Sequence, residues 1–180
     1  MPSGRHSALL ALLLVGGCGG ALPRDEPAAL DVRGAVVTLD TQAPFARAPD
    51  FPARLESTID AALAYWGGAW SILEGTSIEL TDTPRVPCGG AASALGCQEA
   101  RSIRLTVQDP SIGPFACVEQ TVLVHEIGHA VVGDPNHLDP RWMELEPLER
   151  ALAGRPGYTQ EGVVPCVLYL SVWRHILGMP

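Results

Sequence analysis

The sequence contains no lysine: all 12 basic residues are arginine, and they are scattered along 180 residues without forming a basic run. The 20 acidic residues outnumber them and give a formal net charge of −8. Nucleic-acid binding depends on cationic side chains that neutralise phosphates. The composition therefore argues against a nucleic-acid partner, whereas the apolar fraction of 47% is typical of a chain that folds around a core.

Hydrophobic runs long enough to cross a membrane are also missing. The apolar segments at residues 8–15 and 165–177 are both shorter than the roughly 20 residues that a membrane-spanning helix needs. The first segment follows Arg5 and precedes small residues, which is the arrangement of a secretory signal peptide. For the second segment we expect a helix that packs against the rest of the domain.

The expected signal peptide ends in a short motif. The sequence V-G-G-C, which ends at Cys18, resembles the bacterial lipobox, in which the cysteine is acylated and becomes the new N-terminus. This resemblance implies a lipoprotein signal peptide over residues 1–17 and a tether over residues 18–31. Because Gly19 follows the cysteine, it also implies a lipid anchor in the outer membrane of the cell envelope. An ordinary signal peptide that ends near a cysteine is the alternative.

No C-x-x-C pair occurs, which disfavours a metal site built from cysteines. Beyond Cys18 the chain has four cysteines, and an even number in an exported domain predicts disulfides. Three pairings are possible for four cysteines. We favour Cys88 with Cys97, which closes a short loop of glycine and alanine, and Cys117 with Cys166.

Residues 32–180 are enough for one domain, and the order of their patterns predicts the α+β class, with a small twisted sheet covered by helices. Apolar residues at a spacing of three and four predict helices, and β-branched or alternating apolar residues predict strands. We expect helices over residues 53–66, 119–132, 147–153 and 165–177, and strands over residues 36–39, 77–80 and 103–107.

His125, Glu126 and His129 form an H-E-x-x-H motif inside one of these expected helices. Side chains four residues apart lie on the same face of a helix, so both imidazoles can reach one metal ion. Glu126 is displaced by about 100° around the helix, where a carboxylate can take a proton from metal-bound water. Two ordinary histidines on an amphipathic helix are the alternative. Against it, three of the four histidines after the expected signal peptide lie within residues 125–137.

The sequence H-E-I-G-H-A-V-V-G-D-P-N-H, which begins at His125, resembles the HExxHxxGxxH motif of the metzincin zinc metallopeptidases. The glycine and the last histidine stand one and two residues later than in the family pattern. The resemblance implies a zincin-like fold with an active-site helix and Glu126 as the general base. It also implies that Met143 lies under the metal as the Met-turn residue. The implied zinc ligands are His125, His129 and His137.

Two other residues are alternatives for the third zinc ligand. Asp134 would take this place if the protein is similar to snapalysin, which uses an aspartate. Glu149 stands at a distance that resembles thermolysin-like gluzincins, in which a glutamate on a later helix is the ligand. The acidic residue that usually follows such a glutamate four positions later is replaced by Ala153.

These patterns together predict a zinc-dependent endopeptidase that acts on a peptide or protein substrate and touches the membrane only through its N-terminal lipid. Zinc would polarise the scissile carbonyl, and an edge strand before the active-site helix would bind the substrate as an added strand. The alternative is a non-catalytic surface lipoprotein with a structural or vestigial zinc site. A structural site has four protein ligands, whereas a catalytic site leaves one position open.

Overall fold

The computed structural model describes residues 27–153 and 161–170. The expected signal peptide and Cys18 lie outside these residues, as does most of the expected tether. β1 (Ala28–Val32) nevertheless begins inside the segment that the sequence assigns to the tether. Among the described residues, no helix has both the length and the apolar character needed to cross a bilayer.

A five-stranded mixed sheet has the strand order β1-β2-β3-β7-β6. The three central strands pair in parallel, and β1 and β6 are antiparallel edges. The central strands confirm the three sequence predictions, whereas both edges were missed because A-A-L-D-V and G-C-Q-E lack a β-branched or alternating apolar pattern. The bounds of the strands after β1 are β2 (Ala35–Asp40), β3 (Ser77–Thr81), β6 (Gly96–Glu99) and β7 (Ser102–Thr106).

The sheet buries one of its faces. Ile78 and Leu105 point to this face and are fully buried. Glu79 and Arg104, which are paired in register between β3 and β7, are only half-buried on the opposite face. Because side chains alternate along a strand, the helices that cover the apolar face all have to lie on the same side of the sheet.

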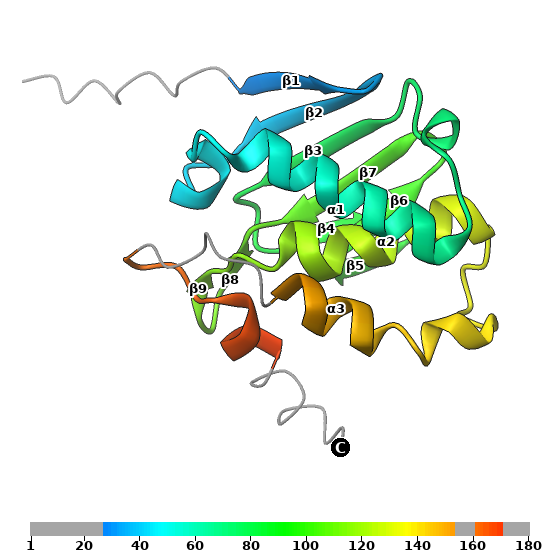
Figure 1. Cartoon of the computed structure of the whole chain (residues 1–180). Coiled ribbons are helices and arrows are strands. Elements are labelled where there is room, and N and C mark those ends of the chain that lie inside the picture. Colours follow the sequence, from blue (N-terminus) through cyan, green and yellow to red (C-terminus); the bar gives the residue numbers. More distant parts are fainter. Residues whose placement is uncertain (1–26, 154–160, 171–180) are drawn as a thin grey trace, which may run out of the picture.

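α1 (Phe51–Trp66) lies across the covered face, and α2 (Leu123–Val132) lies beside it (Figure 1). The Trp66 indole N–H donates a hydrogen bond of 3.0 Å to the Val124 carbonyl oxygen and so joins the two helices. A Cβ at Gly128 would lie 2.7 Å from the Trp66 ring, which is closer than packing allows. Glycine at this position therefore lets α2 pack tightly against the end of α1.

The helix expected over residues 119–132 is present, but its first turn is π-helical (Val118–Val122). Cys117, directly before this turn, forms a disulfide with Cys166. The second disulfide joins Cys88 to Cys97 and thereby ties β4 (Val86–Cys88) to β6. Both expected pairings are thus confirmed.

The remaining described elements are short. α3 (Glu146–Ala153) confirms the third expected helix. Residues 166–170 are helical and start the expected C-terminal helix, whose last part lies outside the described residues. Two small strand pairs were not expected from the sequence. They are formed by β4 (Val86–Cys88) with β5 (Ala91–Ala94), and by β8 (Gln108–Asp109) with β9 (Gly113–Pro114).

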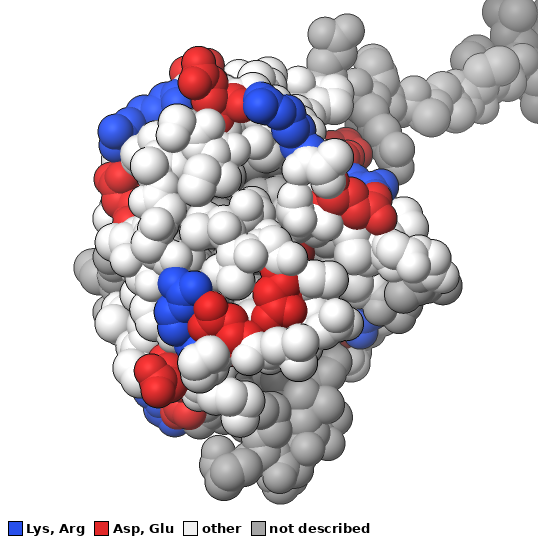
Figure 2. All heavy atoms as spheres, turned by 90° about the vertical axis from the view of Figure 1, so that its right-hand side faces the viewer, with Lys and Arg blue, Asp and Glu red and all other residues white. Residues whose placement is uncertain are grey.

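Five arginines of the described residues form ion pairs with acidic side chains. Arg33 lies 3.2 Å from Asp60, and Arg104 lies 3.2 Å from Glu99. On the face drawn in Figure 2, arginines stand among acidic side chains and do not gather into a continuous basic patch. That face therefore lacks the cluster of basic side chains that binding to a nucleic-acid backbone requires.

Glu119 is fully buried in the π-helical turn, and its two carboxylate oxygens have no hydrogen-bond partner among the described residues. Burial raises the pKa of Glu119 to about 8, although the positive charge of Arg54 opposes this shift. The native state therefore binds a proton to this group more tightly than the unfolded chain does. The free energy of unfolding should consequently fall as the pH rises from 4.5 to about 8.

We expect Glu119→Gln to be more stable than the wild type at about pH 8, because glutamine keeps the shape of the protonated side chain and never ionises. The difference should shrink as the pH is lowered and level off below 4.5, where the native and unfolded states both carry a protonated Glu119. Urea unfolding followed by circular dichroism at several pH values measures this. Glu74→Gln, at an exposed position, controls for the loss of one charge. A stability difference that does not change with pH would contradict the assignment.

Candidate metal centre

Three histidines bring their ring nitrogens together. The Nε2 atom of His125 lies 3.2 Å from Nε2 of His129 and 3.0 Å from Nε2 of His137. One ring nitrogen from each residue lies within 4.8 Å of the other two. Three nitrogen donors that converge in this way could hold a single metal ion. The structure thus brings together the three residues that the sequence singles out as metal ligands.

Two of these histidines, His125 and His129, are one turn apart on α2. Burial, together with the neighbouring imidazoles, lowers the pKa of His125 to about 3, and burial also lowers the pKa of His129. Both shifts favour the neutral form of the ring, which is the form that binds a metal. The Nδ1 atom of His129 lies 2.9 Å from the backbone oxygen of Asp134. If Nδ1–H donates to this oxygen, Nε2 keeps its lone pair for a metal.

The third histidine is placed by the loop that follows α2. The helix ends at Gly133, whose φ of 67° turns the chain. His137 also has a left-handed backbone, with a φ of 56°, which residues other than glycine seldom adopt. The Asp134 carboxylate closes the loop by accepting hydrogen bonds from the backbone N–H groups of Asn136 and Asp139, at 3.0 and 2.8 Å. The loop therefore has a defined shape that returns His137 to the helix.

The two alternative third ligands do not join the three histidines. The Asp134 carboxylate is engaged within the loop, and Glu149 on α3 lines a neighbouring cavity instead. Among the described residues, one other group has the spacing for a metal ion, namely Cys88, Cys97 and Glu99. Its two sulfur atoms are joined in a disulfide, so they are not thiolate ligands.

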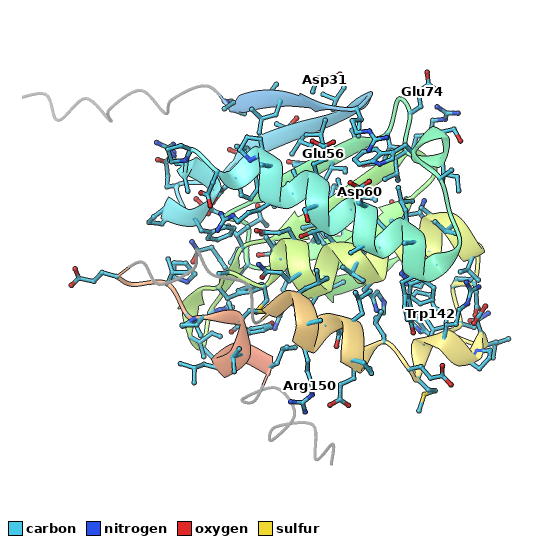
Figure 3. All side chains as sticks on the ribbon, viewed as in Figure 1. Asp31, Glu56, Asp60, Glu74, Trp142 and Arg150 are labelled. Atoms are coloured by element: carbon cyan, nitrogen blue, oxygen red, sulfur yellow. A yellow bond between two sulfur atoms is a disulfide. The ribbon has the colours of Figure 1, made fainter. Side chains whose placement is uncertain are left out.

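Met143 does not lie under the three imidazoles, where the metzincin resemblance places it, because its side chain is 87% exposed. The neighbouring Trp142 lies there instead. The ring centroid of Trp142 is 4.8 Å from those of His125 and His129 and 4.6 Å from that of His137. Figure 3 shows Trp142 near the end of α1, on the segment that follows α2. The 3-10 turn over Pro140–Trp142 directs this residue inward and the next residue outward.

Glu126 is buried beside the histidines and lies against the edge strand β6. Burial raises the pKa of Glu126 to about 7, while a hydrogen bond from the backbone N–H of Gln98 opposes the shift. A Cβ at Gly96 would lie 2.6 Å from Oε1 of Glu126, so only glycine allows the carboxylate to come this close to the strand. With a pKa near neutrality, the carboxyl group can both accept and release a proton.

Two cavities adjoin the histidines and share Gly96, His125 and Glu126 as lining residues. The first has a volume of about 420 Å³ and also contacts His129. The second has a volume of about 570 Å³, and its other lining residues are largely apolar. Space for a ligand therefore adjoins the candidate metal centre at His125 and Glu126. The apolar wall of the second cavity includes Leu95, Val122, Tyr169 and Leu170.

Sequence reasoning missed Gly96, Gln98 and Trp142. Gly96 and Gln98 belong to an edge strand that has no apolar pattern in the sequence. Trp142 stands next to Met143, which the metzincin resemblance singles out instead. The chain matches no protein-family model, no curated protein and no solved structure. The geometry of the site therefore carries the functional argument.

We expect His137→Ala to weaken Zn²⁺ binding by more than the roughly 10- to 100-fold that loss of an outer-shell partner costs, because one of three converging nitrogens is removed. Glu149→Gln should leave the affinity unchanged, since this carboxylate does not join the histidines. Competition with a chromophoric chelator measures both affinities. Equal affinities of His137→Ala and the wild type would exclude His137 as the third ligand.

Proposed function

We propose that this protein is a zinc-dependent endopeptidase in which Glu126 is the general base. The proposed zinc ligands are His125, His129 and His137. The observation that carries the proposal is the convergence of three imidazole nitrogens next to a buried carboxylate, with two cavities adjoining them. In this proposal a lipid on Cys18 holds the exported domain at the cell envelope.

The donor set suits zinc. At Zn–N distances of about 2.0–2.1 Å, a tetrahedral arrangement separates ligand nitrogens by about 3.3 Å. The separations of 3.0 and 3.2 Å between the Nε2 atoms are close to this value. Three protein ligands also leave one position open, as in catalytic zinc sites. When bound, zinc would act as a Lewis acid and lower the pKa of a water molecule to about 7.

Glu126 is placed to move protons at this site. It follows His125 directly, so its carboxylate is held close to the three imidazoles, and the Gln98 N–H group orients it. In the proposed reaction it accepts a proton from the attacking water and then gives that proton to the leaving amine. The pKa of about 7 supports this, because a much more acidic group would accept the water proton poorly, and a much less acidic group would not release it to the amine.

The edge strand β6 supports a peptide as the substrate. The Leu95 carbonyl accepts a hydrogen bond of 2.9 Å from the Thr106 N–H group. Hydrogen-bonded and non-hydrogen-bonded pairs alternate in an antiparallel ladder, so Gly96 and Gln98 direct their backbone groups away from β7. The Gln98 N–H group donates to Glu126, which leaves the Gly96 groups and the Gln98 carbonyl for a substrate strand. An extended peptide can add to such an edge. It would pass Glu126 with residues on both sides of the scissile bond, which favours an endopeptidase over an exopeptidase.

A structural zinc site is the second candidate. It would require a fourth protein ligand. Within residues 27–153 and 161–170, the group contains three histidines and no fourth histidine, cysteine or acidic side chain. The cavities beside the group also leave room for a substrate. Both observations favour the catalytic proposal.

We expect Glu126→Gln to lower kcat on a peptide substrate by roughly 10²- to 10⁴-fold, the contribution of a general base. Zinc binding should be retained, because the amide has nearly the shape of the carboxyl group and is not a proposed ligand. Cleavage of a quenched fluorescent peptide library, with zinc content measured on the same samples, tests this. A zinc-loaded wild type that cleaves no library member, or a variant as active as the wild type, would refute the proposal.

We expect Gly96→Ala to lower kcat while zinc affinity stays the same. The new Cβ would overlap Oε1 of Glu126 and displace the carboxylate, and a misplacement of about 1 Å can cost on the order of 100-fold in rate. Gly68→Ala is the matched control, because its Cβ would lie 2.7 Å from a side-chain carbon of Val131, away from Glu126. Steady-state kinetics on both variants measures the effect. Equal losses of kcat in the two variants would point to general destabilisation and contradict this role of Gly96.

A further inference from the structure

We propose that Trp142 is a positioning residue that holds the three imidazoles in their metal-binding arrangement, and that metal affinity depends on it. The inference rests on the metal site of the proposed function and is independent of peptidase activity. It starts from the observation that the Trp142 ring is in contact with all three histidine rings.

These contacts link ligands from two separate segments. His125 and His129 belong to α2, whereas His137 belongs to the following loop. The Trp142 ring is tilted by 52° and 38° to the two helical imidazoles and stands edge-on, at 89°, to the imidazole from the loop. One rigid side chain thus limits the rotation of all three rings and fixes the loop ligand relative to the helical ligands.

Trp142 is itself held from behind. Its ring centroid lies 4.3 Å from that of Trp66 at the end of α1. On the α2 side, a Cβ at Gly128 would lie 2.6 Å from Cη2 of Trp142, so the indole fills the space that this glycine leaves. With Trp66 against it and α2 in close contact at Gly128, the indole cannot move away from the imidazoles without disturbing the core.

The backbone of this segment is also fastened to α1. Arg141 donates a hydrogen bond of 2.6 Å to the Trp66 carbonyl oxygen, and the Tyr65 hydroxyl donates one of 2.6 Å to the Arg141 carbonyl oxygen. Asp139 caps the turn by accepting the Arg141 backbone N–H and also pairs with the guanidinium group. These bonds keep residue 142 at a fixed position before a metal binds.

Such support has an energetic reason. Neutral imidazoles that aim their lone pairs at one point repel each other until a cation occupies that point. Rings that are free to rotate would turn apart, and metal binding would then have to overcome the cost of ordering them again. A side chain that prevents this rotation means that the rings are already ordered when the protein folds. The free-energy cost of ordering them then no longer lowers the affinity for the metal.

The test is the affinity for Zn²⁺, measured by chelator competition on the wild type, Trp142→Ala, Trp142→Phe and Met143→Ala. We expect Trp142→Ala to bind Zn²⁺ roughly 10- to 100-fold more weakly, the range for residues that support metal ligands. Trp142→Phe should recover most of the affinity, because a ring remains against the imidazoles. Met143→Ala, the matched control, should bind as the wild type does, since its side chain is exposed.

Trp142→Leu covers the case in which the alanine variant does not fold, because leucine fills most of the space. Circular dichroism of the metal-free form checks its fold, and the visible absorption of bound Co²⁺ reports whether the site is still tetrahedral. We expect a weaker affinity and a loss of the tetrahedral Co²⁺ band. Wild-type affinity in a folded Trp142→Ala or Trp142→Leu variant, or an equal loss in Met143→Ala, would overturn the inference. Because no substrate is used, a protein that binds zinc through a Trp142-supported site and cleaves nothing would refute the proposed function alone.

Discussion

The constraint on which the site depends is the close approach of three imidazole nitrogens, with separations of 3.0 and 3.2 Å from His125 to its two neighbours. Lone pairs at such distances repel unless a proton or a cation lies between them, so the fold has to hold the rings in place. It does so from three directions. α2 carries two of the histidines on one face, the loop closed by Asp134 returns the third, and Trp142 lies against all three rings.

The carboxylate next to the metal centre depends on a different part of the fold. Glu126 is supported by β6, which gives it room at Gly96 and a hydrogen bond from Gln98. The Cys88–Cys97 disulfide ties this edge strand to β4 between those two residues. Two of the proposed metal ligands and the proposed general base therefore share α2 but have separate supports, namely Trp142 for the histidines and β6 for Glu126. This separation explains why substitutions at the two supports should affect different quantities, metal affinity in one case and turnover in the other.

The sequence predicts those parts of the site that lie on elements whose residues follow a periodic pattern. The spacing of His125 and His129 follows from the helical period, and the central strands follow from alternating or β-branched residues. The edge strand β6 has no such pattern, so the contacts of Gly96 and Gln98 with Glu126 could not be foreseen. Whether Trp142 or Met143 faces the histidines depends on how a single 3-10 turn is rotated. Because both residues are large and adjacent, the sequence does not show which of them points inward. Local patterns thus predict which elements form, whereas the contacts between elements come from tertiary packing.

The rotational phase of α2 is the remaining requirement, because His125 and Glu126 are adjacent and about 100° apart around the helix. If α2 were rotated by that angle about its axis, one of these two side chains would take the position of the other. The π-helical turn over Val118–Val122 contains one residue more than an α-helical turn would, and it therefore shifts the phase of α2 relative to the chain before it. The Cys117–Cys166 disulfide and the hydrogen bond from the Thr121 hydroxyl to the Cys117 carbonyl fix the start of this turn. The irregular turn thereby directs the histidines toward Trp142 and the glutamate toward β6.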